Sequence, residues 1–122
     1  MNSNPPEQSA ASNEPAARKD YNHQLLDKVI HAPIRFAALT YLLSTGESSF
    51  TELRDNIRAT DGNLSIHLRK LEAAGYVECV KRFECRKPLT VYKVTEKGRE
   101  AFLRHRQHID TICDDLFRFQ SA

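Results

Sequence analysis

The stretch from Thr60 to Gly75 constrains the fold of this 122-residue chain more than any other. Thr60 or Asp61 can cap the start of a helix by accepting from free backbone N–H groups, and Gly75 suits the left-handed position just past its end. Three leucines at helical spacing form one apolar stripe: Leu64, Leu68 and Leu71. The sequence therefore predicts an amphipathic helix over residues 61–74.

The other face of this predicted helix has short polar groups near its start and cations further along. It consists of Asn63, Ser65, Ile66, His67, Arg69 and Lys70. Such a face can meet base edges and phosphates when a helix lies in the DNA major groove. For one helix in isolation, an ordinary solvated face is the simpler interpretation, so the flanking sequence has to decide.

The sequence before residue 60 predicts further helices. Apolar residues recur at helical spacing between Tyr21 and Ile30 and again between Pro33 and Thr45, where Gly46 ends the pattern. Residues 48–50 are too short for an ordinary strand and predict at most a small edge pairing. Residues 51–58 predict a short helix, and residues 59–62 a tight turn. A short helix, a turn and a longer helix with a polar face are typical of a helix-turn-helix.

Two short segments rich in β-branched and aromatic residues follow, at 76–83 and 89–94, with residues 84–88 between them. They predict a β-hairpin. From residue 81 to residue 87 four cations, Lys81, Arg82, Arg86 and Lys87, stand against Glu84, a local charge of +3. The whole chain carries only +2, so its basic charge is concentrated at the tip of this hairpin.

A last helix is predicted from about residue 96 to residue 119. Its apolar positions alternate in steps of three and four, as in a helix–helix seam: Phe102, His105, Ile109, Ile112, Leu116 and Phe119. At 1.5 Å per residue this helix would extend roughly 36 Å, more than the upstream helices would cover, so we expect a helix of a second subunit to bury the rest. Residues 1–19 have no large apolar side chain and predict a disordered tail.

Composition excludes several classes of protein. No apolar run is long enough to span a bilayer, the N-terminus lacks the apolar region of a signal peptide, and three cysteines without paired spacing favour a reducing cytoplasm. There is no Gly-rich phosphate loop, nucleophile elbow or paired motif of catalytic spacing. We therefore expect a cytoplasmic protein that is not an enzyme and needs no cofactor.

The order of predicted elements resembles the winged helix-turn-helix domain of MarR/ArsR-type transcriptional regulators, a mainly α fold with a small β-hairpin. The resemblance covers roughly residues 21–119 and rests on residues 31–35, 50–53, 60–71, 75–77 and 92–98. It implies a winged helix-turn-helix domain over residues 20–95 and a long dimerisation helix over 96–122, carrying the seam residues above. It also implies a homodimer, expected to be a repressor, on a roughly palindromic DNA operator.

The resemblance further implies that the recognition helix enters the major groove and that the wing, residues 81–88, touches the backbone or minor groove. Asn63, Ser65, Ile66, His67, Arg69 and Lys70 would then face the groove, and Lys81, Arg82, Arg86 and Lys87 would be the wing contacts. Early side chains of the helix suit base edges, the later Arg69 and Lys70 suit phosphates, and wing cations add affinity without reading sequence.

Three alternatives stay open at this point. The first is a metal sensor that uses His105, His108 and Cys113 across a dimer, although their spacing lacks a paired Cys-x-x-Cys form. The second is a redox switch in which Cys79 and Cys85 meet across the wing. The third is a winged helix that binds a protein instead of DNA, which the basic wing disfavours. The sequence does not indicate which small-molecule effector, if any, is sensed.

Overall fold

The computed structural model describes the backbone of residues 25–121 and the side chains of residues 25–114. It confirms a mainly helical winged-helix fold with a small sheet, in the order α1 (Pro33–Thr45), β1 (Ser48–Ser49), α2 (Phe50–Ile57), α3 (Asp61–Ala73), β2 (Val77–Glu84), β3 (Lys87–Val94) and α4 (Glu96–Ser121). The chain divides into two compact units. Residues 27–105 form one unit, which contains the winged helix, and the described residues outside that range belong to the other. The tail predicted at 1–19 lies outside the described residues.

The core of the winged-helix unit is built from the apolar stripes that the sequence predicts. Pro33 begins α1, and Gly46 follows it with φ at 89°, a conformation in which a side chain would be strained. Leu64, Leu68 and Leu71 all turn inward from α3. The buried apolar residues of the cluster are Ile30, Ala38, Leu39, Leu42, Leu53, Leu64, Leu68, Leu71, Val77 and Ala101.

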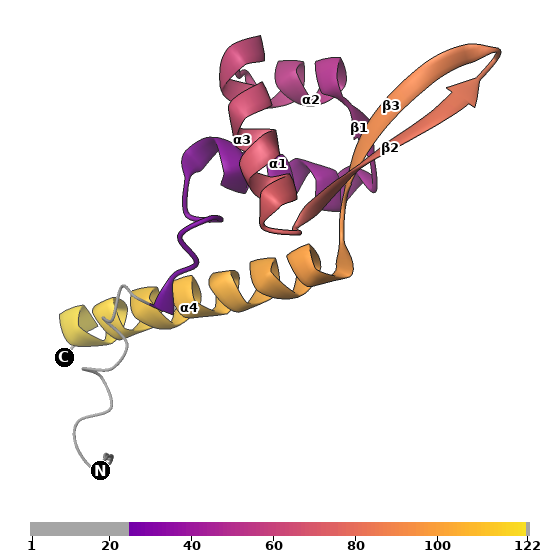
Figure 1. The fold of residues 1–122 in the computed structure, drawn as a ribbon. Helices are drawn as coiled ribbons and strands as arrows, with labels where there is room; N and C mark the ends of the chain where they lie inside the picture. The colour runs from indigo at the N-terminus through magenta and orange to yellow at the C-terminus, as the bar shows by residue number, and fades with distance from the viewer. Residues whose placement is uncertain (1–24, 122) are drawn as a thin grey trace. The chain divides into compact units, whose positions relative to one another are not determined.

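The sheet has the strand order β1-β3-β2, and both pairings are antiparallel. The small edge pairing predicted at residues 48–50 is present, because Ser48 and Ser49 pair with Tyr92 and Val91. The β2–β3 hairpin projects beyond α1, α2 and α3 (Figure 1). Its strands are longer than predicted: they continue to Glu84 and from Lys87, so the connection is the two-residue turn Cys85-Arg86 instead of residues 84–88.

The prediction of a helix between Tyr21 and Ile30 is wrong where the structure describes the chain. Residues 25–32 form a short 3₁₀ segment and turns, and residues 21–24 lie outside the described part. Asp27 explains the difference, because its Oδ1 accepts from the backbone N–H groups of Val29 (2.9 Å) and Ile30 (3.2 Å). An aspartate that binds the backbone two and three residues on favours a turn over a continuing helix.

The start of α4 is fixed against the end of α3. Thr95 Oγ1 accepts from the N–H of Gly98 (3.0 Å) and donates to the carbonyl of Gly75 (2.6 Å). Gly98 is buried, and a Cβ there would lie 2.2 Å from the carbonyl oxygen of Tyr76. Only glycine allows the backbone of α4 to approach so closely. None of the helices within the described residues is long and apolar enough to cross a membrane.

The first part of the predicted dimer seam on α4 is used inside the protomer. The ring of Phe102 stacks on Phe36 with centroids 5.3 Å apart, and His105 is only 1% exposed. His105 therefore has almost no surface left for a second subunit, and the dimer seam as a whole stays a prediction. Ile109 and Ile112 are half-buried, and the side chains of Leu116 and Phe119 lie outside the described ones.

Candidate nucleic-acid interface

Helix α3 presents the face that the sequence singles out. Because Leu64, Leu68 and Leu71 are buried, the remaining positions of α3 face away from the core. Asn63, Arg69 and Lys70 are exposed, and Ile66 is 49% exposed. Ser65 is half-buried and accepts from Arg69 Nη2 at 3.4 Å. Polar, cationic and apolar groups therefore alternate along one exposed face.

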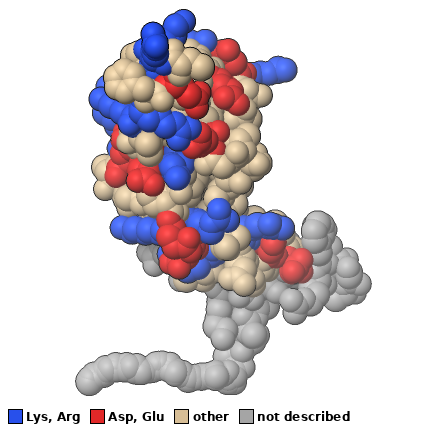
Figure 2. Space-filling view, turned by 90° about the vertical axis from the view of Figure 1, so that its right-hand side faces the viewer, with Lys and Arg blue, Asp and Glu red and all other residues tan. Residues whose placement is uncertain are grey.

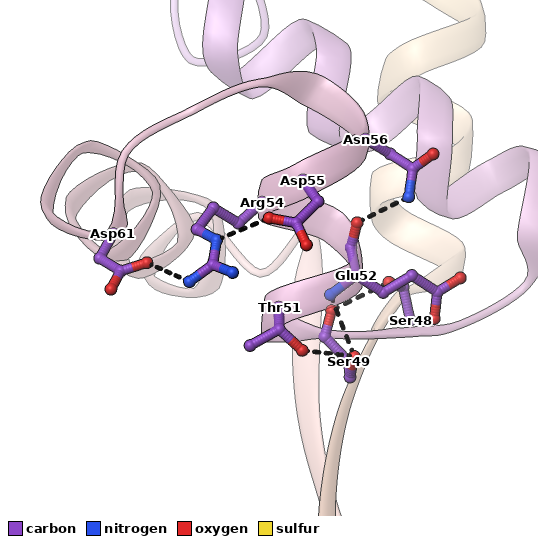
Figure 3. Close-up of polar contacts among 8 residues, drawn as sticks. All are labelled: Ser48, Ser49, Thr51, Glu52, Arg54, Asp55, Asn56 and Asp61. Carbon is purple, nitrogen blue, oxygen red and sulfur yellow. Dashed lines mark hydrogen bonds and ion pairs between the residues drawn. The ribbon is translucent and has the colours of Figure 1, made fainter.

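Helix α2 holds the N-terminal end of α3 in place (Figure 3). Thr60 caps α3 by accepting from the N–H of Asn63 (3.2 Å), as the sequence predicts. Arg54 of α2 donates to Asp61 Oδ1 (2.7 Å) and to Asp55 Oδ1 (2.9 Å), and these two bonds raise the pKa of its guanidinium. Arg54 thus links α2 to α3, and its positive charge is paired with carboxylates of the protein itself.

The start of α2 is also capped by small polar side chains. Ser49 caps α2 by accepting from the N–H of Glu52 at 3.2 Å, and its hydroxyl lies 3.4 Å from that of Thr51 (Figure 3). In the turn between α2 and α3, Arg58 adopts φ of 59°, in the left-handed region. Arg58 is exposed. Sequence reasoning missed this cation because it regarded residue 58 only as the end of a helix.

His67 is placed differently from its neighbours on α3. It is half-buried, and its Nδ1 lies 2.9 Å from Nη1 of Arg35. Arginine can only donate, so Nδ1 accepts and the ring is neutral, with its proton on Nε2. Burial, followed by the charges of Arg35 and Lys70, lowers the pKa of His67. One ring nitrogen is therefore used inside the protein, and only Nε2–H is left for a ligand.

The wing carries the second group of candidate residues. Lys81, Arg86 and Lys87 are exposed, and Arg82 forms an ion pair with Glu47, which precedes β1. That hydrogen bond raises the pKa of the Arg82 guanidinium. Counting Glu47 with the wing lowers the local charge from the +3 of the sequence to +2. Figure 2 faces the side from which the wing projects, and Lys and Arg side chains crowd its upper end with Asp and Glu among and below them.

The turn at the wing tip has a backbone conformation that its residue types do not predict. Both central residues have positive φ, 52° at Cys85 and 65° at Arg86. Two-residue hairpin turns of this kind normally contain Asn-Gly or Asp-Gly, because side chains are strained there. Without glycine at either position, sequence reasoning assigned a longer connection. Cys85 and Arg86 stand at the outermost point of the wing.

The geometry does not support the redox alternative. Cys79 lies within β2 opposite Tyr92, whereas Cys85 lies in the turn, and both are free thiols. Six residues of nearly continuous strand separate them by roughly 20 Å. A disulfide needs Cα atoms within about 7 Å, so these two cysteines cannot pair across the wing of one protomer.

The metal alternative meets a similar obstacle at His105. The backbone N–H of Asp27 donates to Nδ1 of His105 (3.1 Å), so the ring proton lies on Nε2, which is 3.3 Å from Nδ1 of His31. Both nitrogens of His105 then serve contacts within the protomer. In the described part of the chain, no group of three His, Cys, Asp or Glu side chains is arranged to hold a metal ion.

Asp27 connects this buried histidine to the turn after α3. Its Oδ2 accepts from the hydroxyl of Tyr76 (2.7 Å), and burial together with this bond raises the pKa of Tyr76 to about 12. Tyr76 follows Gly75, where α3 ends. The polar contacts around Asp27 therefore tie the segment before α1 to the turn after α3 and to α4.

Comparison with known proteins agrees with this geometry. Residues 34–113 match the family described as winged helix DNA-binding domain. An uncharacterized protein of Methanocaldococcus jannaschii is 37% identical over 75 residues, which are 62% of this chain and 82% of that protein. The solved structure of a transcriptional regulator homologue from Pyrococcus horikoshii is 26% identical with a TM-score of 0.72, over 80% of this chain and 97% of that one.

More distant structures share the fold. The transcriptional regulator BldR from Sulfolobus solfataricus is 19% identical with a TM-score of 0.58, over 84% of this chain and 72% of its own. A likeness at that level of identity concerns the architecture and not the residues of the interface.

Proposed function

Because the chain belongs to the family of winged helix DNA-binding domains, we propose that it is a sequence-specific transcriptional regulator that binds an operator as a homodimer. Helix α3 enters the major groove, and the wing, residues 81–88, lies on the backbone or in the minor groove. A two-fold dimer reads two half-sites, so the operator is roughly palindromic. Such a dimer occludes the DNA that it covers, and we propose that it represses transcription.

The observation that supports this proposal is the order of side chains along the exposed face of α3, which changes from an amide to an apolar group and then to cations. Asn63 lies in the first turn, where its backbone N–H donates to the capping hydroxyl of Thr60, so its backbone is fixed and its exposed side-chain amide can reach a base edge. Ile66 offers an exposed apolar side chain that suits a thymine methyl group. Arg69 and Lys70 follow on later turns, where phosphates are the expected partners.

Dimerisation would use the part of α4 that follows the winged-helix unit. Phe102 and His105 are engaged within the protomer, so the proposed seam consists of Ile109, Ile112, Leu116 and Phe119. Ile109→Glu should produce monomers in sedimentation experiments. Gln107→Glu, an added charge at an exposed position of the same helix, should leave the dimer intact. A dimer that survives Ile109→Glu would place the interface elsewhere.

The function is tested by selecting duplexes from a randomised pool with the full-length protein, then measuring affinity for selected and scrambled DNA at two salt concentrations. Asn63→Ala should cost about 1–3 kcal/mol on the selected duplex and little on scrambled DNA. Lys87→Ala should weaken binding to both about equally. Arg99→Ala, which removes an exposed cation from α4, serves as the control for net charge. Failure to select any sequence would contradict the proposal and favour a protein partner.

A further inference from the structure

The wing tip carries an exposed aromatic ring that none of the contacts proposed above uses. Phe83 is 75% exposed, whereas the other large apolar residues described as exposed lie between 37% and 52%. It stands in β2 among charged residues, two positions before the turn. A ring exposed to this degree is available to a partner, and its burial there would be favourable.

The register of the hairpin gives Phe83 an apolar neighbour. Phe83 lies directly opposite Pro88, and Glu84 lies opposite Lys87 beside the turn. In a two-residue hairpin the pair beside the turn is hydrogen-bonded, so the next pair is not, and its side chains are the closer ones. Pro88 therefore loses no ladder hydrogen bond. It is exposed as well, so the two rings form an apolar pair near the tip.

The fold supplies no third strand or helix to cover this pair. Strand β1 reaches only Val91 and Tyr92 of β3, so beyond Thr90 the wing is a two-stranded ribbon among the described residues. Cations surround the pair: Lys81 lies two residues before Phe83 on the same face of the strand, Arg86 lies in the turn, and Lys87 follows directly after it. An apolar edge flanked by cations complements a ligand with an anionic rim and a less polar interior.

We propose that Phe83, backed by Pro88, is an apolar wedge that enters the minor groove of bound DNA beside each half-site. The groove has this chemistry, with phosphates along both edges and the apolar faces of sugars and stacked bases between them. Minor-groove proteins commonly insert apolar side chains that partly unstack a base step, while cations hold the neighbouring phosphates. The inference rests on the proposed function, because α3 in the major groove brings the wing onto the adjacent DNA.

The wedge adds a preference that base contacts do not explain. Pyrimidine–purine steps unstack most easily, so such a step under the wing should bind better than a stiffer one. This preference should disappear in Phe83→Ala, whereas the preference read by Asn63 in the major groove should remain.

The test uses full-length protein and a duplex that the wild-type protein has selected from a random pool. Phe83→Ala should weaken binding about tenfold, and Phe83→Leu, which keeps an apolar side chain, clearly less. Neither should change the dependence of affinity on salt, because no cation is lost. Arg86→Ala should instead reduce that dependence by about one counterion per protomer. A 2-aminopurine placed in the step under the wing should brighten with the wild type and stay dark with Phe83→Ala.

Several outcomes would overturn the wedge. Equal affinity of wild type and Phe83→Ala, with the selected sequence unchanged, would refute it while leaving the regulator intact. A loss accompanied by a smaller salt dependence would show that Phe83 only positions the wing cations. A change of oligomeric state in Phe83→Ala would make a second copy of the chain its partner. If the wild type selects no duplex at all, the proposed function fails first and the wedge fails with it.

Discussion

Replacing the strained turn at the wing tip should separate the stability of the wing from its binding of DNA. Cys85 and Arg86 have φ of 52° and 65°. The left-handed region costs an ordinary residue about 1–2 kcal/mol, whereas asparagine tolerates it and glycine is unstrained there. We therefore expect Cys85→Asn and Arg86→Gly each to stabilise the fold, and the double variant to have the Asn-Gly turn that this hairpin geometry favours.

The magnitude follows from two opposing effects. Arg86→Gly relieves about 1–2 kcal/mol of strain, but the greater freedom of glycine in the unfolded chain takes back about 0.5–1 kcal/mol. Each substitution should then add roughly 0.5–1 kcal/mol to the free energy of unfolding. Together the two substitutions should add about 1–2 kcal/mol, so for a domain of this size the double variant should melt about 4–10 °C higher.

The same turn offers variants that separate strain from charge. Arg86→Ala removes the cation but keeps a side chain at positive φ, so it should weaken DNA binding without raising the melting temperature. Arg86→Gly should weaken DNA binding equally but raise the melting temperature. Cys85→Asn should raise the melting temperature with no loss of DNA binding, because it removes no charge.

Circular dichroism melts and DNA titrations at two salt concentrations measure both properties. A double variant that melts no higher than the wild type would show that the turn is not strained. Different DNA affinities for Arg86→Ala and Arg86→Gly would show that the shape of the turn, in addition to its charge, matters for binding.

Two further predictions concern the helices. Gly98→Ala should destabilise the fold by about 2 kcal/mol or more, because its Cβ would lie 2.2 Å from the Tyr76 carbonyl; Gly62→Ala, where a Cβ would meet nothing within 4 Å, should be neutral or stabilising, and equal melting temperatures for the two variants would refute this. The pKa of His67 is lowered in the folded protein, so the unfolded chain binds a proton at this residue more readily than the folded chain does. The neutral ring of His67 therefore contributes stability above the unfolded pKa of about 6.5, and this contribution is lost as pH falls through the folded pKa. His67→Gln should reduce the loss of stability between neutral and mildly acidic pH, and denaturant titrations that give identical pH profiles for variant and wild type would contradict that reasoning.

Much of the winged helix could be predicted because its elements are specified locally. The bounds of α1, the Thr60 cap and the inward leucines of α3 all follow from patterns within a few residues. Periodicity and capping depend on neighbours along the chain, and these are what a sequence displays directly.

Two features of the structure go beyond what residue spacing shows, one through a local contact and one through a distant one. The apolar spacing before Pro33 favours a helix, but the side chain of Asp27 binds the backbone just after it and makes a turn. His105 fits a seam by spacing, yet its Nδ1 accepts from the N–H of Asp27, 78 residues away in sequence. The turn at Cys85 and the exposure of Phe83 were missed for another reason: neither position carries the residue type usual for its conformation or exposure.

The ion pair between Arg82 and Glu47 shows why charge along the sequence does not measure charge available to DNA. Glu47→Gln leaves Arg82 without its carboxylate and should raise both the affinity for DNA and its salt dependence, the latter by about 0.9 per protomer if Arg82 then meets a phosphate. Glu78→Gln removes the same charge from an exposed position of β2 that makes no described ion pair, so it is the matched control. It should raise affinity slightly through net charge and leave the salt dependence unchanged. If the two variants behave alike, Arg82 is either free in the wild type or too far from the DNA to matter, and the wing contacts reduce to Lys81, Arg86 and Lys87.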